Sequence, residues 1–169
     1  MSFREIRPEE LDGNVFSMIG NDWMLIGAEK DGEFNMMTAS WGGMGVLWGK
    51  NVAFVFIRPQ RYTYSIVENS DRLTLSFFGG EEREALNLCG KISGRDVDKV
   101  RESKLTPFVT NEGCKSFKEA AVIMECRKLY ADFIKENCMA DSSIMKCYPK
   151  NDFHKMYICE ISRILVRVN

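Results

Sequence analysis

Short runs of strand-like sequence, separated by equally short helical runs, are the feature that most limits what this chain can fold into. Residues 51–57 (NVAFVFI) are continuously apolar and rich in β-branched and aromatic side chains, which predicts a buried strand. Residues 72–78 and 154–168 alternate apolar and polar side chains at the period of a strand. Because long helices do not alternate with these strands, the pattern favours a barrel or sandwich over a doubly wound parallel sheet.

Turn residues and composition add further elements to this pattern. Asp31-Gly32 separates residues 22–29 from residues 33–40, which predicts a β-hairpin. Short helices are predicted where helix-forming residues follow a strand. These helices are expected over residues 60–68, 81–88 and 96–103, and a polar helical stretch is expected over residues 138–147.

Residues 120–134 fit two structures. Their apolar side chains at positions 122, 126, 129, 130 and 133 lie on one face of a helix. The β-branched beginning of the segment, and the polar side chains at positions 125 and 127, fit a strand instead. Periodicity alone favours the helix.

Composition and charge exclude several classes of protein. The 23 basic and 24 acidic side chains leave a net charge of −1, whereas nucleic-acid-binding domains usually carry a clear basic excess. The chain has no repeat, no low-complexity tract and no linker, so a single domain over residues 1–169 is expected. Its longest apolar run, residues 52–57, is far too short to span a membrane.

The termini and the cysteines indicate where such a protein works. The N-terminal MSFREIRPEE is charged where a signal peptide is apolar, so we expect a cytoplasmic protein with no membrane or nucleic-acid partner. The six cysteines include no C-x-x-C pair, which excludes the usual zinc and iron–sulfur motifs. We therefore expect reduced and mostly buried thiols.

The familiar motifs of nucleotide-binding and hydrolytic enzymes are missing. Gly43-Met44-Gly45 has Trp48 where a dinucleotide fingerprint needs its third glycine, and neither Gly-Lys pair belongs to a Walker loop. No G-x-S-x-G or H-E-x-x-H sequence occurs. With His154 as the single histidine, a histidine-rich metal site is excluded and no metal is expected.

What remains is a set of phosphate-binding residue types beside predicted strands. Thr38 and Ser40 end one strand, Arg58 and Arg61 follow another, and residues 90–96 (GKISGRD) combine basic, hydroxyl and glycine residues. A phosphate is bound by hydroxyls, backbone N–H groups and guanidinium groups, and a helix N-terminus behind a proline would add oriented donors. Each motif taken alone is more often a solvated turn.

Taken together and in order, four segments resemble one family. NMMTASWGG (35–43), IRPQRYTY (57–64), CGKISGRDVDK (89–99) and HKMYICEI (154–161) are similar to the flavin reductase-like, FMN-binding split-barrel proteins, in particular the flavoredoxin-type branch. The resemblance implies a mainly β fold, a Greek-key split β-barrel with short peripheral α-helices. It also implies a homodimer, non-covalently bound FMN near the dimer interface, and a strand rather than a helix over residues 120–134.

The resemblance also implies which residues form the site. By position in the motifs, the FMN-binding residues would be Met37, Thr38, Ala39, Ser40, Trp41, Arg58, Arg61, Tyr62, Thr63, Ser93 and Arg95. His154 matches a C-terminal histidine that lies near the nicotinamide in some flavin reductases, and is the one candidate catalytic residue. The chain departs from the family at Asn51, where relatives often have proline, and in a glycine-rich loop over residues 42–49.

Several of these residues also have an interpretation that does not involve a cofactor. Trp41 and Trp48 fit core or interface aromatics, and His154 fits a surface histidine at the beginning of a strand. Cys89 is expected to be buried and inert. Lys99, with the basic residues that follow it, fits the solvated face of a short helix.

The leading hypothesis is an FMN-dependent oxidoreductase that passes electrons from NAD(P)H or a redox partner, through FMN, to an acceptor. NAD(P)H would be a transient donor, and the partner would be a small molecule or a protein. A second hypothesis is an FMN-binding electron-transfer protein with no small-molecule substrate of its own. A third is a split-barrel dimer that has lost the cofactor and serves as a binding or structural protein.

Overall fold

The architecture is organised around one long C-terminal strand. The computed structural model describes residues 2–168. Strand β10 (Lys155–Val168) pairs antiparallel with β9 (Val122–Phe133) on one side and with both β5 (Lys50–Ile57) and β1 (Ser2–Ile6) on the other. Register shifts against β9, between residues 158 and 159 and between residues 161 and 163, increase the local twist and bend of the pair.

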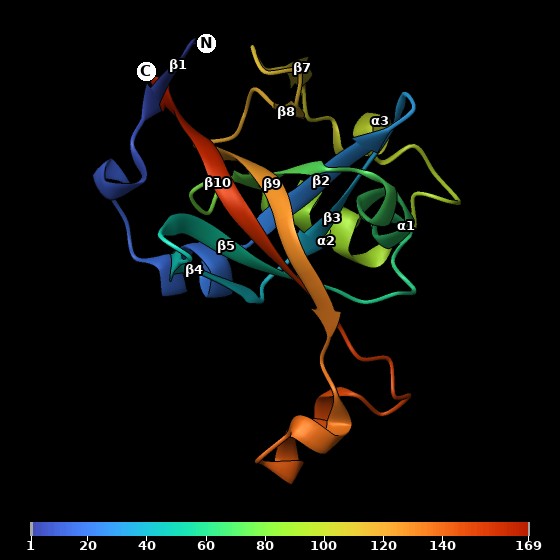
Figure 1. Cartoon of the computed structure of the whole chain (residues 1–169). Helices are drawn as coiled ribbons and strands as arrows, with labels where there is room; N and C mark the ends of the chain where they lie inside the picture. The colour runs from blue at the N-terminus through green and yellow to red at the C-terminus, as the bar shows by residue number, and fades with distance from the viewer. Residues whose placement is uncertain (1, 169) are drawn as a thin grey trace.

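The sheet curls into a Greek-key split β-barrel, as the resemblance implied (Figure 1). Its strand order is β3-β2-β6-β9-β10-β5-β4, with β1 added on β10. The remaining strands of this order are β2 (Met24–Lys30), β3 (Glu33–Ala39), β4 (Gly42–Leu47) and β6 (Arg72–Phe77). Strands β3 and β4 stand at opposite ends of the order, so the barrel is open between them.

Two tight hairpins use the residues that such turns require. Asp31 and Gly32 both have positive φ and join β2 to β3, which confirms the predicted hairpin. Trp48 and Gly49 also have positive φ and join β4 to β5. The expected loop over residues 42–49 is therefore wrong: most of it is strand β4, whose pairing with β5 outweighs the weak strand preference of its glycines.

The ambiguous segment, residues 120–134, contains strand β9 and no helix, so the family resemblance was right and the periodicity was misleading. Ile123 packs in one hydrophobic core and Met124 and Cys126 in the other, because both faces of this part of β9 are covered. A strand buried on both faces loses the simple alternation that marks a half-buried one.

Two cores explain the long apolar runs of the sequence. The larger core fills the barrel, and the smaller lies between the sheet, helix α2 (Arg83–Lys91) and the hairpin of β7 (Pro107–Val109) and β8 (Lys115–Phe117). In β2, Met24 and Ile26 belong to the barrel core and Leu25 to the second core. The cysteines are free thiols, and most are buried, as expected.

The helices are short and gather on one side of the barrel (Figure 1). They are α1 (Tyr62–Asn69), α2 and α3 (Lys99–Ser103), each close to its predicted position. Pro59 lies before α1, in a turn that the Arg61 N–H closes by donating to the Arg58 carbonyl over 3.0 Å. Within residues 2–168, no helix has the length and apolarity to cross a membrane.

The connection between β9 and β10, residues 134–153, is here called the arm. Figure 1 shows it projecting beyond the ends of both strands. It contains two 3₁₀ helices, η3 (Glu136–Cys138) and η4 (Ser142–Cys147). The polar helix expected over residues 138–147 is therefore realised only as 3₁₀ turns.

The N-terminal elements were not predicted. They are β1, a 3₁₀ turn η1 (Pro8–Glu10) and a π-helical turn η2 (Ser17–Asp22). Pairing with β10 makes β1 part of the sheet and brings the two ends of the chain together (Figure 1).

Candidate functional site

The ends of β3 and β5 and the beginning of β10 surround a cavity of about 280 Å³. It is lined by Met37, Thr38, Ala39, Ser40, Trp41, Phe56, Arg58, Arg61 and His154. All of these except Phe56 are predicted site residues, so the structure brings three separate motifs together at one place. Phe56 was missed because the apolar run of β5 gives no sign of which side chains face a cavity.

The end of β3 places its side chains on alternate sides. Met37 and Ala39 point into the barrel core, which holds the backbone of this segment firmly. Thr38 points the other way, and its hydroxyl donates to the Leu86 carbonyl of α2 over 2.5 Å. Trp41 is 46% exposed, so the interpretation of this residue as a core aromatic is wrong.

A buried cation, Lys99, and a partly buried one, Arg61, meet at the C-terminal end of α2. Arg61 donates to the carbonyl oxygens of Gly90 (2.7 Å) and Cys89 (3.0 Å). Lys99 donates to the same Cys89 oxygen (3.0 Å) and to the Met36 oxygen of β3 (3.0 Å). The end of a helix leaves its last carbonyl groups unpaired and carries partial negative charge, so cations are stabilised there.

Lys99 contradicts the expectation of a solvated lysine. It is only 4% exposed, and burial together with the nearby Arg61 charge lowers its pKa to about 8. Burial also lowers the pKa of Arg61. Among residues 2–168 neither cation forms an ion pair with a carboxylate; both are held by carbonyl oxygens alone. This arrangement leaves positive charge uncompensated beside the cavity, which favours an anionic ligand.

Cys89 lies within this cluster but is not a reactive group. Its side chain is fully buried, and burial raises its pKa to about 11 in spite of the Lys99 and Arg61 charges. A thiol in this state is protonated at neutral pH and is a poor nucleophile. Cys89 therefore contributes its carbonyl oxygen to the site, and its side chain packs in the second core.

Arg58 has a different environment, which the arm supplies. Its guanidinium pairs with the Asp152 carboxylate, donates to the Cys147 carbonyl over 2.8 Å and lies over the Tyr148 ring at 5.3 Å. The hydrogen bond from Arg58 holds the pKa of Asp152 below its usual range. The Arg58 charge is therefore neutralised within the protein, in contrast to the charge of Arg61.

His154 is buried, at 8% exposure, so the interpretation as a surface histidine is wrong. Its ring lies 5.0 Å from the Trp41 ring, and its Nδ1 atom is 3.0 Å from the Tyr148 hydroxyl. Burial, helped by the nearby Arg58 charge, lowers the pKa of His154 to about 4. The imidazole is therefore neutral at physiological pH.

The other predicted residues, Tyr62, Thr63, Ser93 and Arg95, do not line this cavity. The Thr63 hydroxyl is buried and accepts a hydrogen bond from the Asn35 amide over 2.9 Å. The Tyr62 hydroxyl donates a hydrogen bond to the Glu33 carboxylate.

Ser93 and Arg95 form a separate local arrangement. The Ser93 hydroxyl accepts from the Arg95 backbone N–H over 3.2 Å, and the Arg95 guanidinium lies 4.9 Å from the centre of the Tyr62 ring. This group lies beside a second cavity of about 390 Å³, whose lining includes Tyr62 and Lys99. Arg61, which lines the first cavity, and Lys99, which lines the second, both donate to the Cys89 carbonyl oxygen, so this oxygen links a lining residue of each cavity.

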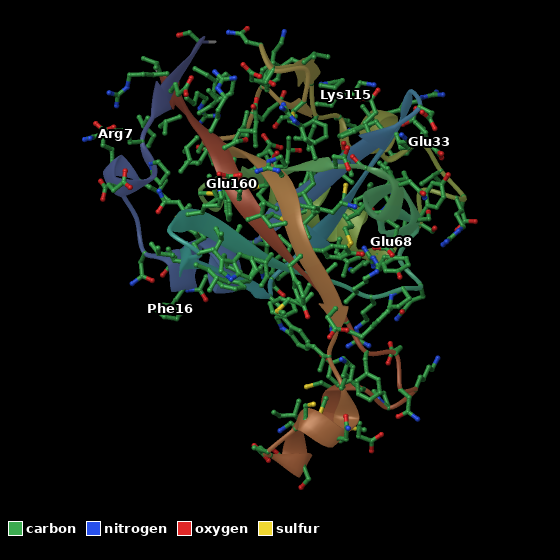
Figure 2. All side chains as sticks on the ribbon, in the orientation of Figure 1. Arg7, Phe16, Glu33, Glu68, Lys115 and Glu160 are labelled. Atoms are coloured by element: carbon green, nitrogen blue, oxygen red, sulfur yellow. The ribbon has the colours of Figure 1, made fainter. Side chains whose placement is uncertain are left out.

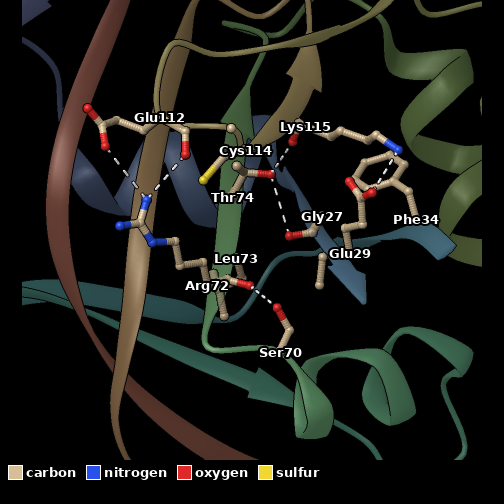
Figure 3. Close-up of a pocket in the computed structure, with 12 residues that line it drawn as sticks. Gly27, Glu29, Phe34, Ser70, Arg72, Leu73, Thr74, Glu112, Cys114 and Lys115 are labelled. Carbon is tan, nitrogen blue, oxygen red and sulfur yellow. Dashed lines mark hydrogen bonds and ion pairs between the residues drawn. The ribbon is translucent and has the colours of Figure 1, made fainter. Parts of the chain in front are cut away.

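A third cavity, of about 270 Å³, lies between β2, β6 and the residues that precede β8 (Figure 3). It shares no lining residue with the first cavity. Its charged side chains are paired with one another, Lys115 with Glu29 at 3.0 Å and Arg72 with Glu112 at 3.9 Å. Because these charges compensate one another, the first cavity is the better candidate for an anion-binding functional site.

A larger and mostly apolar cavity, of about 720 Å³, adjoins the candidate site and shares Ser40, Trp41 and Phe56 with it. Its other lining residues come from the N-terminal segment, β4 and the arm, and none of them is charged. The candidate site therefore opens on one side to a region suited to an uncharged molecule.

Residues 16–167 match the family model described as Flavin reductase like domain. The chain belongs to this family. No curated protein shows a significant sequence match to the chain.

Solved structures of similar proteins share the fold. A flavoredoxin from Methanosarcina acetivorans has a TM-score of 0.66 at 19% identity, with 96% of this chain and 76% of that chain covered. An FMN-binding domain of a flavin reductase-like enzyme from Shewanella baltica has a TM-score of 0.70 at 13% identity, with 98% and 77% covered. An FMN-binding protein from Thermus thermophilus with bound 1-cyclohex-2-enone has a TM-score of 0.64 at 19% identity, with 94% and 79% covered.

The buried ammonium group of Lys99 predicts an unusual pH dependence of stability. Between pH 8 and 10.5 the unfolded lysine keeps its proton and the folded one has lost it, so the free energy of unfolding should rise with pH. We expect the difference between the flavin-free wild type and Lys99→Met to change by on the order of 2 kcal/mol between pH 7 and 10, measured by urea unfolding. The exposed Lys118→Met variant is the control. If the free energy of unfolding of Lys99→Met depends on pH in the same way as that of the wild type, Lys99 does not carry a buried charge.

Proposed function

We propose that this protein is an FMN-binding oxidoreductase of the flavin reductase and flavoredoxin type. It would pass electrons from NAD(P)H or a redox partner, through bound FMN, to an acceptor. The observation that carries the proposal is the single cavity where the family motifs converge, next to Lys99, which is buried, and Arg61, which is partly buried; within residues 2–168 neither has a carboxylate partner.

The cations fit the phosphate end of FMN. Arg61 lines the cavity, and Lys99 binds the same carbonyl oxygen, so both charges are held in place before any ligand arrives. The first turn of α1 begins directly after Arg61, and the first N–H groups of a helix have no partner within the helix. A phosphate dianion would supply the negative charge that the protein itself does not provide.

The rest of the cavity fits a planar ring. Trp41 and Phe56 supply apolar and aromatic contacts, and residues 38–41 form part of the cavity wall. When bound, FMN supplies a ring that accepts a hydride and releases electrons singly or in pairs. The protein's own residues bind and orient it, which requires no catalytic carboxylate pair and no nucleophile.

The apolar cavity beside the site is the proposed place for the donor or acceptor. It adjoins the candidate site at Trp41 and carries no charged side chain. A nicotinamide ring, or an uncharged acceptor, would enter there while the phosphates of NAD(P)H remain outside.

The exposure of Trp41 favours a second candidate function, electron transfer to a protein partner. Its ring forms one wall of the cavity and is 46% exposed, so a redox group beside it would be close to the molecular surface. Under this alternative the apolar cavity has no small-molecule substrate, and electrons leave across the exposed edge of the site.

We also propose a homodimer that forms through the outer face of β4, β5, β10 and β9. Across these strands Gly43, Phe54, Ile158 and Tyr130 are successive register partners and so lie in one row. Trp48, 58% exposed, packs against Tyr130 with ring centres 6.4 Å apart. An exposed apolar face of this kind marks a protein–protein interface.

An exposed aromatic side chain also lies beside this face: Phe16, 88% exposed, points outward beside the apolar cavity (Figure 2). The proposed interface therefore borders the candidate site.

The first test is the absorption spectrum of the purified protein, before and after anaerobic addition of NADH. We expect a flavin spectrum that bleaches within seconds, because a nicotinamide can reach the ring through the apolar cavity. A flavin spectrum that NADH leaves unchanged would favour the electron-transfer protein. Protein that stays colourless after incubation with FMN would reject both functions and support a barrel that has lost its cofactor.

Replacement of Arg61 tests the phosphate end of the site. We expect Arg61→Ala to weaken FMN binding by about 1.5–3 kcal/mol, because a charge-assisted hydrogen bond to the phosphate is lost. Fluorescence titration of FMN measures the affinity, and Arg101→Ala, an exposed arginine of α3, is the control. An unchanged affinity in Arg61→Ala would remove this residue from the site.

Replacement of Trp48 tests the proposed dimer. We expect the wild type to sediment as a dimer at micromolar concentration, and Trp48→Glu to raise the dimer dissociation constant by at least about tenfold. Val109→Glu is the control, because Val109 is also exposed but lies on β7, away from the proposed interface. A wild-type monomer, or a dimer that Trp48→Glu leaves intact, would contradict this face.

A further inference from the structure

The single histidine of the chain packs against two aromatic rings. The Trp41 ring lies 5.0 Å from the His154 ring, and the Tyr148 ring lies 5.6 Å from it and is nearly perpendicular. Tyr148 comes from the arm, and only 3% of it is exposed. The Nδ1 atom of His154 and the Tyr148 hydroxyl are 3.0 Å apart, which is a good hydrogen-bond distance.

The direction of this hydrogen bond follows from what each group can do. Burial raises the pKa of Tyr148, so the phenol keeps its proton, and His154 is neutral. Within residues 2–168, Nδ1 is the only hydrogen-bond partner of the Tyr148 hydroxyl. If Nδ1 carried the imidazole proton, the buried phenol hydrogen would have no acceptor, which is costly.

We propose that Tyr148 is a positioning residue: its hydroxyl donates to Nδ1 of His154 and thereby fixes the tautomer in which Nε2 carries the proton. Because His154 lines the cavity and Nδ1 is occupied, Nε2–H is the group that the ring offers to a bound molecule. His154 is then a neutral hydrogen-bond donor rather than a base. This role rests on the proposed function, since the molecule that receives the hydrogen bond is the flavin or its acceptor.

The surroundings of His154 support a neutral donor. Arg58 lies over the Tyr148 ring, and its charge disfavours a positive imidazole. Asp152 acts in the opposite direction but is paired with Arg58, and Trp41 and Phe153 bring no charge. A donor of this kind suits an oxygen atom of the ligand that gains negative charge during reduction.

The test uses the fact that this chain has one histidine, so the imidazole nitrogen spectrum has a single source. Two-bond proton–nitrogen correlation spectra of the ¹⁵N-labelled protein, recorded from pH 6 to 8, identify the protonated nitrogen. We expect a protonated Nε2 and a hydrogen-bonded, unprotonated Nδ1 throughout. A protonated Nδ1, averaged signals or a titration within this range would overturn the proposal, whether or not any variant folds.

Removal of the hydroxyl tests the part played by Tyr148. In Tyr148→Phe we expect the Nδ1 signal to move to the position of a nitrogen without a hydrogen bond, as the proton is shared between the two tautomers. Tyr130→Phe is the matched control, since its hydroxyl is exposed, lies near Asp132 and does not touch His154. An unchanged spectrum in Tyr148→Phe would show that another group fixes the tautomer.

Kinetics separate this inference from the proposed function. In the FMN-loaded protein, we expect Tyr148→Phe to slow flavin bleaching by NADH by about two- to tenfold with unchanged FMN affinity. In a His154→Gln background the same change should have no further effect, because the amide has no tautomer to fix. If the protein binds no flavin, the proposed function is wrong, and the nitrogen spectra alone then decide whether Tyr148 fixes the tautomer. If the effects of the two substitutions add in the double variant, only the role of Tyr148 is wrong.

Discussion

The buried ammonium group of Lys99 is the contact on which the arrangement of the site depends. It joins the backbone of β3, through Met36, to the last turn of α2, through Cys89, and it does so from α3. Arg61, at the beginning of α1, binds the same Cys89 oxygen. Three short helices, none of them able to persist alone in water, are thus fixed to the strand that forms the cavity wall. The cost of burying Lys99 and part of Arg61 is met by the Met36 oxygen of β3 and by the Cys89 and Gly90 oxygens, which are left unpaired at the end of α2.

The parts of the fold that could be predicted from sequence are those with a local cause. Asp31-Gly32 sets its own turn, and the apolar run at residues 51–57 can only be buried. The motif residues of the site were found through the family resemblance, because hydroxyls and arginines beside strands are individually common. The structure adds that eight of the predicted residues share one cavity while Tyr62, Thr63, Ser93 and Arg95 lie outside it.

What sequence reasoning missed has a cause elsewhere in the chain. Strand β9 looks helical because two different cores take its apolar side chains, and β4 looks like a loop because its strand character comes from β5. Lys99 looks solvated because nothing near it in sequence reveals the carbonyl oxygens of residues 36 and 89. The arm contacts Arg58 and His154 through residues that have no motif of their own. In each case the deciding contact is long-range, and local propensity is a weak guide to it.

The two sides of the cavity differ in charge because they are built by different elements. On the side of α2, Arg61 and Lys99 have no acidic partner within residues 2–168, so positive charge remains. On the side of the arm, Asp152 pairs with Arg58 and His154 is neutral. A ligand with an anion at one end and a planar, uncharged ring at the other matches this polarity. The same ligand bound in the opposite direction would have its anion against a neutral surface. The arm is therefore more than a connection between β9 and β10: by pairing Asp152 with Arg58 it leaves positive charge on the α2 side of the cavity, and this asymmetry would orient a ligand of the proposed kind.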